Sequence, residues 1–399
     1  MNLSRRSLLK GLLGGAAAAG ASRLGFDPRL ALADDAEAPA VVCVYFNGGF
    51  NSLFCCAKDL APTTFKGDPK QASPGVFVDR TTLGTLPADA LAMMSVIGVN
   101  HGISAHPTAR AAVWGDGKTS YAIELAAALG GTEAFRCVTI GNVSLPENIG
   151  LAPVDGVSAQ QVRDLDVFAS VLGASALPAG PLGTGVSGAR TASSNRFAAS
   201  PGKLAGLSNA YDTVLANVRS PAPGITAATL SNIRAAYGLE AGSKLVNTDL
   251  TGHFAGAELA IAAGAKVINI MSQGWDSHGD VDGSVVRGQM SSSVIPGLKT
   301  FLQRMLLGAP GANRNVVVCL FGDFARSLQS SGHQPNLSAC VFGKHVKPGT
   351  TGAVSSKDVT LLAPKGDPGS AMKGMWSYFA AAARCAGAPF GANPHGLIK

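Results

Sequence analysis

KVINIMSQGWDSH, residues 266–278, is the stretch from which the fold can be inferred. Its first part is rich in β-branched and apolar side chains, which predicts a buried strand over 266–272. Asp276 and His278 follow in the turn beyond it. Ligands bind beyond the carboxyl ends of strands in α/β sheets, so these two side chains are candidates for metal binding or acid/base chemistry. The alternative is a polar loop in which Asp276 caps the next helix.

Two further apolar runs end in polar residues in the same way. The run NVVVCLF, 315–321, leads to Gly-Asp-Phe-Ala-Arg-Ser at 322–327, and the run VVCVYF, 41–46, leads to Asn-Gly-Gly-Phe-Asn-Ser at 47–52. Parallel strands bring their carboxyl ends to one edge of a sheet, where carboxylates and imidazoles suit one divalent metal, zinc or similar. The candidate metal ligands are Asn51, Asp276, His278, Asp323 and His333.

A polar cluster also precedes a predicted helix at 109–114. The segment HGISAHPT, 101–108, places a proline in the first helical turn, where proline is favoured. Because a helix N-terminus is a natural anion site, Ser104, His106 and Thr108 are candidate catalytic residues. The alternative is that a hydroxyl of this group only caps the helix. Arg326 joins the candidates, either as the ligand of an oxyanion such as phosphate or sulfate or as the partner of Asp323.

Strands and helices alternate along most of the chain. Further strands are expected at 94–99, 137–140 and 338–342, and further helices at 121–129, 253–263, 285–307 and 372–385. Pro296 should kink or restart the helix in which it lies. The alternation predicts an α/β fold with a doubly wound, mainly parallel sheet. Residues 57–90 are expected to be loop-rich, and the Ala/Ser/Gly/Pro-rich composition of 157–250 predicts a helical and loop insertion outside the sheet.

Residues 1–33 have the composition of an export signal. A paired-arginine motif at 4–10 precedes a Gly/Ala/Leu run at 11–21, and Ala-Leu-Ala at 31–33 offers a cleavage site. This pattern resembles twin-arginine signals, which implies export of a folded chain, 34–399, that is then periplasmic or secreted; the alternative is a basic amphipathic helix. No later run reaches the roughly 18 apolar residues of a membrane span, so no anchor is expected.

Composition excludes two classes of protein. With 46% apolar and 14% charged residues, the chain is not of the disordered type. Five basic residues and one acidic residue of the +7 chain fall in 1–33, so the rest carries about +3 without a basic cluster, and nucleic acid is not an expected partner. The seven cysteines form no C-x-x-C motif. Cys43, Cys137 and Cys319 are expected as buried thiols inside strands, and disulfide pairs cannot be assigned.

Taken in order, the motifs resemble the DUF1501 family, exported bacterial proteins of unknown function related to the alkaline phosphatase and sulfatase superfamily. The motifs are Gly-Gly-x-Asn at 48–51, His-Pro at 106–107 before a Trp-containing helix, Gly-Trp-Asp-Ser-His at 274–278, Gly-Asp-Phe-Ala-Arg-Ser at 322–327, and His333. The resemblance covers most of the chain after the signal. It is strongest over 253–345 and nearly absent over 160–250.

The resemblance implies an alkaline-phosphatase-like fold, in which strand-end Asp and His residues hold two zinc or similar ions and a Ser or Thr at a helix start is the nucleophile. Residues 275–278 match the family's Trp-Asp-Thr-His, and 322–327 match its Ser-Glu-Phe-Gly-Arg-Thr. Asn51 and Gly332 stand where the family usually has aspartates, and His106-Pro107 begins the helix that corresponds to the nucleophile helix. These departures imply one metal ion or none.

Two functions follow from these observations. The first is a non-catalytic or degenerate scaffold of that superfamily, which is exported and serves an unknown cell-envelope partner. The second is a metal-dependent hydrolase of phosphate or sulfate esters, in which a small oxyanion ester is the substrate and water or Thr108 is activated.

Overall fold

The computed structural model describes residues 37–51, 53–57, 69–131, 133, 135–141, 153–172, 225–326, 332–351 and 368–399. The chain divides into a unit of Met1–Ala38 and a unit of Pro39–Lys399, and the second is the subject below. The predicted export signal and the Ala/Ser/Gly/Pro-rich stretch from 173 to 224 lie outside the described residues. Within the described ranges no helix combines the length and the apolar character that a membrane crossing requires.

The central element is an eight-stranded sheet that is mostly parallel. Its strands, in spatial order, are β13 (Gly349–Thr351), β6 (Met94–Val99), β12 (Leu337–Phe342), β10 (Arg314–Gly322), β1 (Ala38–Phe46), β9 (Val267–Ser272), β7 (Cys137–Ile140) and β8 (Ala159–Val162). Strands β1, β9, β7 and β8 run parallel, whereas β12 is antiparallel to both β10 and β6. The predicted α/β fold with a mainly parallel sheet is confirmed.

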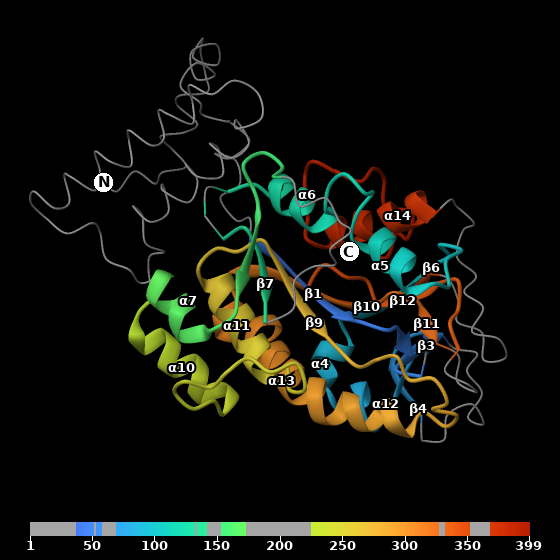
Figure 1. The fold of residues 1–399 in the computed structure, drawn as a ribbon, viewed down its shortest axis with the longest axis horizontal. Coiled ribbons are helices and arrows are strands. Elements are labelled where there is room, and N and C mark those ends of the chain that lie inside the picture. Colours follow the sequence, from blue (N-terminus) through green and yellow to red (C-terminus); the bar gives the residue numbers. More distant parts are fainter. Residues whose placement is uncertain are drawn as a thin grey trace, which may run out of the picture. The chain divides into compact units, whose positions relative to one another are not determined.

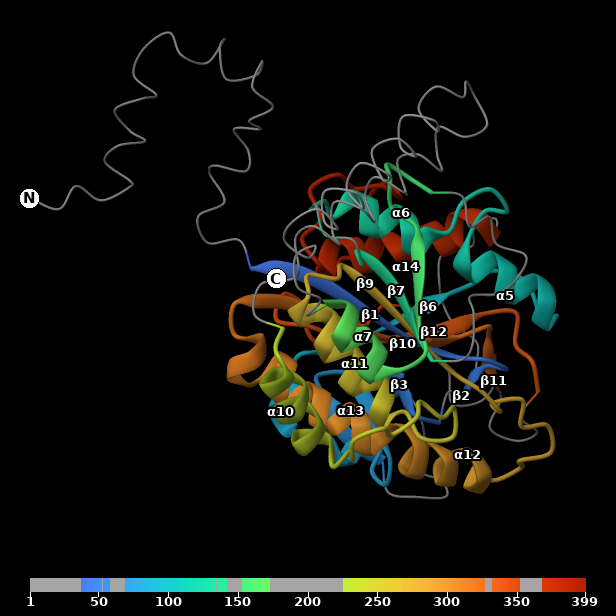
Figure 2. The same ribbon diagram turned by 60° about the vertical axis from the view of Figure 1, so that its left-hand side comes forward.

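Both faces of this sheet are covered by helices (Figures 1 and 2). Alternate residues of β1 enter different cores: Val41, Cys43 and Tyr45 join one cluster, and Val42, Val44 and Phe46 join the other. The first cluster packs against α5 (His106–Trp114), α6 (Tyr121–Ala128) and α14 (Pro368–Ala382). The second packs against α11 (Thr251–Ala262) and α13 (Ile295–Phe301). A strand buried on both faces needs a continuous apolar run, as the sequence of β1 has.

The long helix predicted around Pro296 is a composite. It runs through α12 (Ser284–Gln289), a π-helical turn η4 (Met290–Val294), α13 and a second π-helical turn η5 (Leu302–Leu306). Pro296 lies in the first turn of α13. Because proline has no amide hydrogen and its ring crowds the preceding turn, a wider π turn before it accommodates the ring. The predicted interruption is thus confirmed at this residue.

The structure corrects two expectations about the sheet. Residues 159–162 were expected outside it, but β8 pairs with β7 along its edge. Within the described part of the expected insertion, α7 (Leu165–Leu172) and α10 (Ala227–Tyr237) are helices, as predicted. The stretch expected to be loop-rich contributes to a separate three-stranded sheet of β3 (Cys55–Ala57), β5 (Val76–Asp79) and β4 (Pro69–Ser73), followed by η3 (Leu83–Thr85) and α4 (Ala88–Leu91). These strands are too short for a clear alternation pattern.

The cysteines are distributed between one bridge and several buried thiols. Cys55 of β3 forms a disulfide with Cys340 of β12, which fastens the small sheet to the large one. Cys43, Cys137 and Cys319 are free and buried inside strands, as predicted.

Candidate metal centre

Four candidate ligand residues meet at one point beyond the ends of the sheet. His106 begins α5, Asp276 and His278 follow β9, and His333 lies in the segment that leads to β12. One ligand atom from each residue lies within 4.8 Å of the ligand atoms of the other three. The structure therefore brings Asp276, His278 and His333 together as predicted, and it adds His106, which the sequence placed among the catalytic candidates.

The loop after β1 positions Asp276 through its backbone. Gly48 has φ +114°, and a Cβ atom at Gly48 would lie 2.4 Å from the amide nitrogen of Asp276, so only glycine permits this contact. Trp275 is buried beside it, donates its indole N–H to Ser272 Oγ at 2.7 Å, and donates its backbone N–H to Asn47 O at 3.2 Å. These contacts fix the peptide that carries the carboxylate.

Asp323 lies behind His106 and is not among the four converging residues. Its carboxylate has no exposed surface and accepts hydrogen bonds from the Tyr45 hydroxyl and, at 3.3 Å, from the Gly48 N–H. Its Oδ2 lies 2.7 Å from His106 Nδ1. A carboxylate in this place keeps the proton of the imidazole on Nδ1, so that the Nε2 lone pair faces the cluster. The sequence predicted Asp323 as a metal ligand. In the structure Asp323 instead contacts the candidate ligand His106 from behind.

His333 is oriented in the same manner. Its Nδ1 lies 2.8 Å from the backbone carbonyl oxygen of Ser104, which can only accept a hydrogen bond, so Nδ1 carries the proton and Nε2 faces the cluster. Burial lowers the pKa of His333, the Ser104 hydrogen bond acts in the opposite direction, and the nearby Arg326, with His106 and His278 whenever these are protonated, lowers it further. A neutral imidazole is the form that binds a metal.

The Phe324 ring holds two of the imidazoles in place. Its centroid is 4.7 Å from that of His106 and 4.3 Å from that of His333. The Nε2 atoms of His333 and His278 are 2.9 Å apart. Two nitrogen lone pairs repel at this distance, so a proton or a metal ion between them is needed to make the contact favourable.

Arg326 brings a fixed positive charge to the same point. Its side chain is fully buried, its Nε donates to Gly48 O at 2.5 Å, and its Nη2 donates to Asp276 Oδ1 at 2.5 Å. The same Nη2 is 3.4 Å from His106 Nε2 and 3.3 Å from His333 Nε2. Burial alone would raise the pKa of Asp276, but the charge and hydrogen bond of Arg326, with the charges of His106 and His278, lower it. The carboxylate is therefore ionised at neutral pH.

The remaining predicted residues lie around this group without joining it. Asn51 is buried, accepts a hydrogen bond from the Leu53 amide at 2.9 Å, and lies in β2 (Phe50–Asn51), which pairs with β11 (Ala325–Arg326). Ser104 contributes its carbonyl oxygen, and Thr108 is exposed on α5. Tyr45 is the residue that sequence reasoning missed, because a tyrosine inside an apolar strand is usually a core residue. Its only signal was its position next to the strand's end.

This arrangement can hold a metal ion and leave one side open to solvent. Three imidazoles and one carboxylate form a ligand set typical of zinc and similar ions. The side chains of Asp276 and His278 are 52% and 57% exposed, whereas the side chain of His106 is 21% exposed. Water and small anions can therefore reach the cluster from the side of Asp276 and His278, while the opposite side is closed by Phe324 and the buried Asp323.

Comparison with known proteins finds no relative of this chain. No family model matches the chain, and neither a curated protein nor a solved structure matches it. The assignment of the site depends on its own geometry.

Proposed function

We propose that the protein binds one divalent metal ion, zinc or a similar ion, at His106, Asp276, His278 and His333, and that it hydrolyses phosphate or sulfate esters there. The observation that carries the proposal is the orientation of two imidazoles. Asp323 and the Ser104 carbonyl fix His106 and His333 with their Nε2 lone pairs toward the same point. Orienting partners of this kind accompany most histidines that bind metals.

In such a hydrolysis the residues around the cluster would have different roles. A divalent ion, when bound, polarises an ester oxygen and increases the acidity of water. The Arg326 guanidinium, held beside the cluster by Gly48 and Asp276, supplies a fixed positive charge that attracts a phosphate or sulfate group. The Asp323 carboxylate holds the His106 proton on Nδ1, and Phe324 excludes water from the inner side of both rings.

The resemblance to the DUF1501 family supports the same proposal from the sequence side. The alkaline phosphatase superfamily places its metal ligands on strand-end loops, as this chain does with Asp276 and His278. The paired-arginine segment further supports a place in the periplasm or outside the cell, because the twin-arginine pathway exports folded proteins. Fold-level kinship alone would not decide the chemistry.

A second candidate is an exported, non-catalytic scaffold, which one specific observation favours. Nη2 of Arg326 already contacts Asp276 and lies near both oriented imidazoles, so the network holds a cation without any metal. A metal bound by all four residues would have to displace these contacts. In addition, the hydroxyl candidates are not aimed at the cluster, since Ser104 contributes its backbone carbonyl and Thr108 is exposed.

The two candidates are separated by metal content and turnover of the same preparations. The full chain and the variants Asp276→Ala and His278→Ala are analysed for bound metal and assayed on aryl phosphate and aryl sulfate. A hydrolase should carry about one metal ion per chain, and both variants should lose metal and turnover together. His345→Ala, a histidine outside the cluster, serves as the control. A folded, metal-free and inert wild-type protein would refute the hydrolase and support the scaffold.

A further inference from the structure

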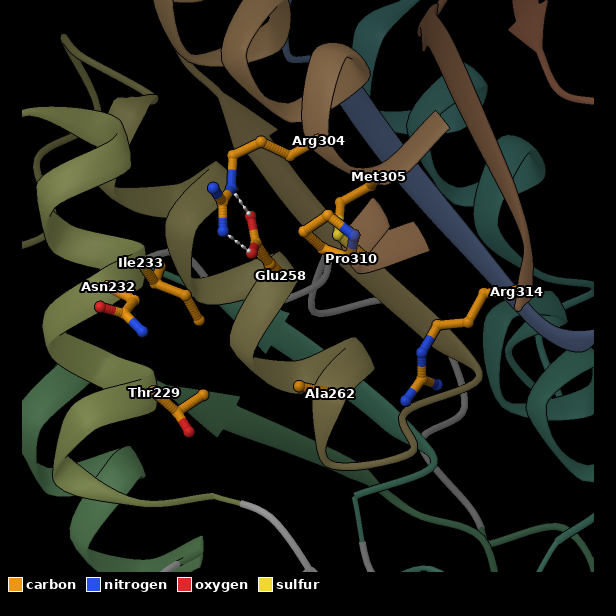
Figure 3. A pocket seen from close by; sticks show the side chains of 9 residues that line it. All are labelled: Thr229, Asn232, Ile233, Glu258, Ala262, Arg304, Met305, Pro310 and Arg314. Atoms are coloured by element: carbon orange, nitrogen blue, oxygen red, sulfur yellow. Dashed lines mark hydrogen bonds and ion pairs between the residues drawn. The ribbon is translucent and has the colours of Figure 1, made fainter. Parts of the chain in front are cut away.

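A cavity separate from the metal centre lies between α10, α11 and the segment that connects η5 to β10 (Figure 3). Its volume is about 260 Å³. Ile233, Ala262, Met305 and Pro310 give it apolar walls, as Figure 3 shows. A hollow of this size admits a small molecule rather than a drug-sized one.

One wall of the cavity is an internally neutralised ion pair. Arg304 donates from Nε to Glu258 Oε2 at 2.8 Å and from Nη2 to Glu258 Oε1 at 2.6 Å, which is a bidentate contact. The Tyr237 hydroxyl donates to the same Oε2 at 3.1 Å. Both charges are thus satisfied, and this pair leaves no excess charge for a ligand.

Arg314, at the start of β10, lines the opposite part of the cavity and has no such partner. Its guanidinium makes no hydrogen bond or ion pair with any of the described residues. Burial lowers the pKa of Arg314, and the charge of Glu133 acts in the opposite direction, but Glu133 faces Lys266 at 3.5 Å. An arginine remains charged in proteins, so Arg314 is a partly buried cation whose N–H donors pair with none of the described residues, although the charge of Glu133 acts on it from a distance.

We propose that this cavity binds a small amphipathic monocarboxylate, with its carboxylate on Arg314 and its alkyl or aryl body against Ala262, Met305 and Pro310. The guanidinium fork matches a carboxylate in two hydrogen bonds. A monoanion balances the one unpaired charge. A phosphate dianion is disfavoured because it would bring one more negative charge than the single guanidinium of Arg314 balances. This inference is independent of the proposed metal chemistry.

The test is calorimetric titration of the EDTA-treated full chain with hexanoate, hexanamide and hexyl phosphate, so that a bound metal cannot capture the carboxylate. Hexanoate should bind roughly tenfold or more tightly than hexanamide, since hydrogen bonds to a charged group are stronger than those to a neutral amide. Arg314→Gln should weaken hexanoate by a similar factor. Ala262→Phe, which fills the cavity from the α11 side, should weaken all three ligands.

Arg384→Gln, an exposed arginine elsewhere in the chain, is the matched control and should bind hexanoate like the wild type. The thermal unfolding of each variant shows whether it is folded. Any of three results would overturn the inference: no saturable hexanoate binding, equal binding by wild type and Arg314→Gln, or tighter binding of hexyl phosphate than of hexanoate. Equal affinity of Ala262→Phe for hexanoate would show that the ligand binds elsewhere, at Arg326 for example, and would also overturn it.

Discussion

Asp323 is buried, yet it makes more of the hydrogen bonds that orient the candidate site than the residues that face solvent do. Its two oxygens serve Tyr45, Gly48 and His106, and its exposed fraction is zero. The orientation of His106 is therefore decided by a side chain that no metal would contact. Removing the negative charge should disturb the imidazole while leaving all four ligands in the chain.

Asp323→Asn is accordingly expected to weaken metal binding about 10- to 100-fold, the range found when partners behind metal ligands are changed. Competition titration with a chromophoric zinc chelator measures this affinity. Asp116→Asn, an exposed aspartate in the loop before α6, is the control and should leave the affinity unchanged. Wild-type affinity in Asp323→Asn would mean that the buried carboxylate does not orient His106.

Gly48 offers a test that touches no ligand. Alanine there would combine a positive φ of +114° with a Cβ atom 2.4 Å from Asp276 N, so the loop carrying Asp276 and His278 must move. Gly48→Ala should lose measurable metal binding. Gly75→Ala has a positive φ of +76° with open space around the new methyl group, and it should bind metal normally. Equal metal content in both variants would contradict the proposed positioning.

Two histidines outside the site should make stability depend on pH. Burial lowers the pKa of His253 and of His395 to about 4, whereas an unfolded histidine titrates near 6.5. The unfolded chain therefore binds more protons between these values, and stability is lost as pH falls from about 6.5 to about 4. Each residue contributes about 3 kcal/mol of this loss at most. Urea unfolding at pH 7.5 and 4.5 measures it.

His253→Gln should make that pH dependence shallower, because it removes one of the buried imidazoles whose pKa is lowered. His345→Gln is the control and should retain the wild-type slope. If His253→Gln and the wild type lose the same free energy of unfolding between pH 7.5 and 4.5, the buried imidazole is not the cause.

At the residue level, the sequence predicted which side chains converge better than it predicted their roles. Asp276, His278 and His333 could be grouped because strand-end residues of a parallel sheet share an edge. The sequence could not predict that His106, rather than Asp323, would be a candidate ligand. Which of the two faces the cluster depends on the side-chain atoms that point inward. That choice is made by Tyr45 and the Gly48 amide, which come from a different part of the chain.

Among the elements, long apolar strands were predictable and short polar ones were not. Strands β1, β9 and β10 are largely apolar and almost fully buried, so their composition identifies them. By contrast, β4 has the sequence PKQAS, and its strand conformation comes from pairing with β5 rather than from its own residues. Likewise, nothing in the sequence of β12 itself indicates that it runs antiparallel to β10 and β6.

The disulfide between β3 and β12 links the small sheet covalently to the large one. Because Cys55 and Cys340 are 285 residues apart, the bridge restricts a long loop in the unfolded chain. Cys340→Ala should lower the free energy of unfolding by about 2–5 kcal/mol. Denaturation with and without dithiothreitol measures the effect. The wild type should lose stability in the reductant, and Cys340→Ala should not respond to it.

For the molecule as a whole, metal binding should increase the free energy of unfolding. A ligand that binds only the folded chain adds RT ln(1 + [L]/Kd), which is about 4 kcal/mol at a thousandfold excess over Kd. The midpoint of thermal unfolding should therefore rise with added zinc and fall with EDTA. His278→Ala should show no response to either. A zinc response of the same size in His278→Ala would place the ion at another site.

The four converging residues come from segments near positions 106, 276 and 333, which are far apart in the sequence and meet in the folded chain. A partly made chain that ends before His333 would have the strand and the aspartate but no complete cage. Metal binding at this point would therefore report that the chain has finished folding. It would distinguish mature copies from immature ones before any chemistry begins.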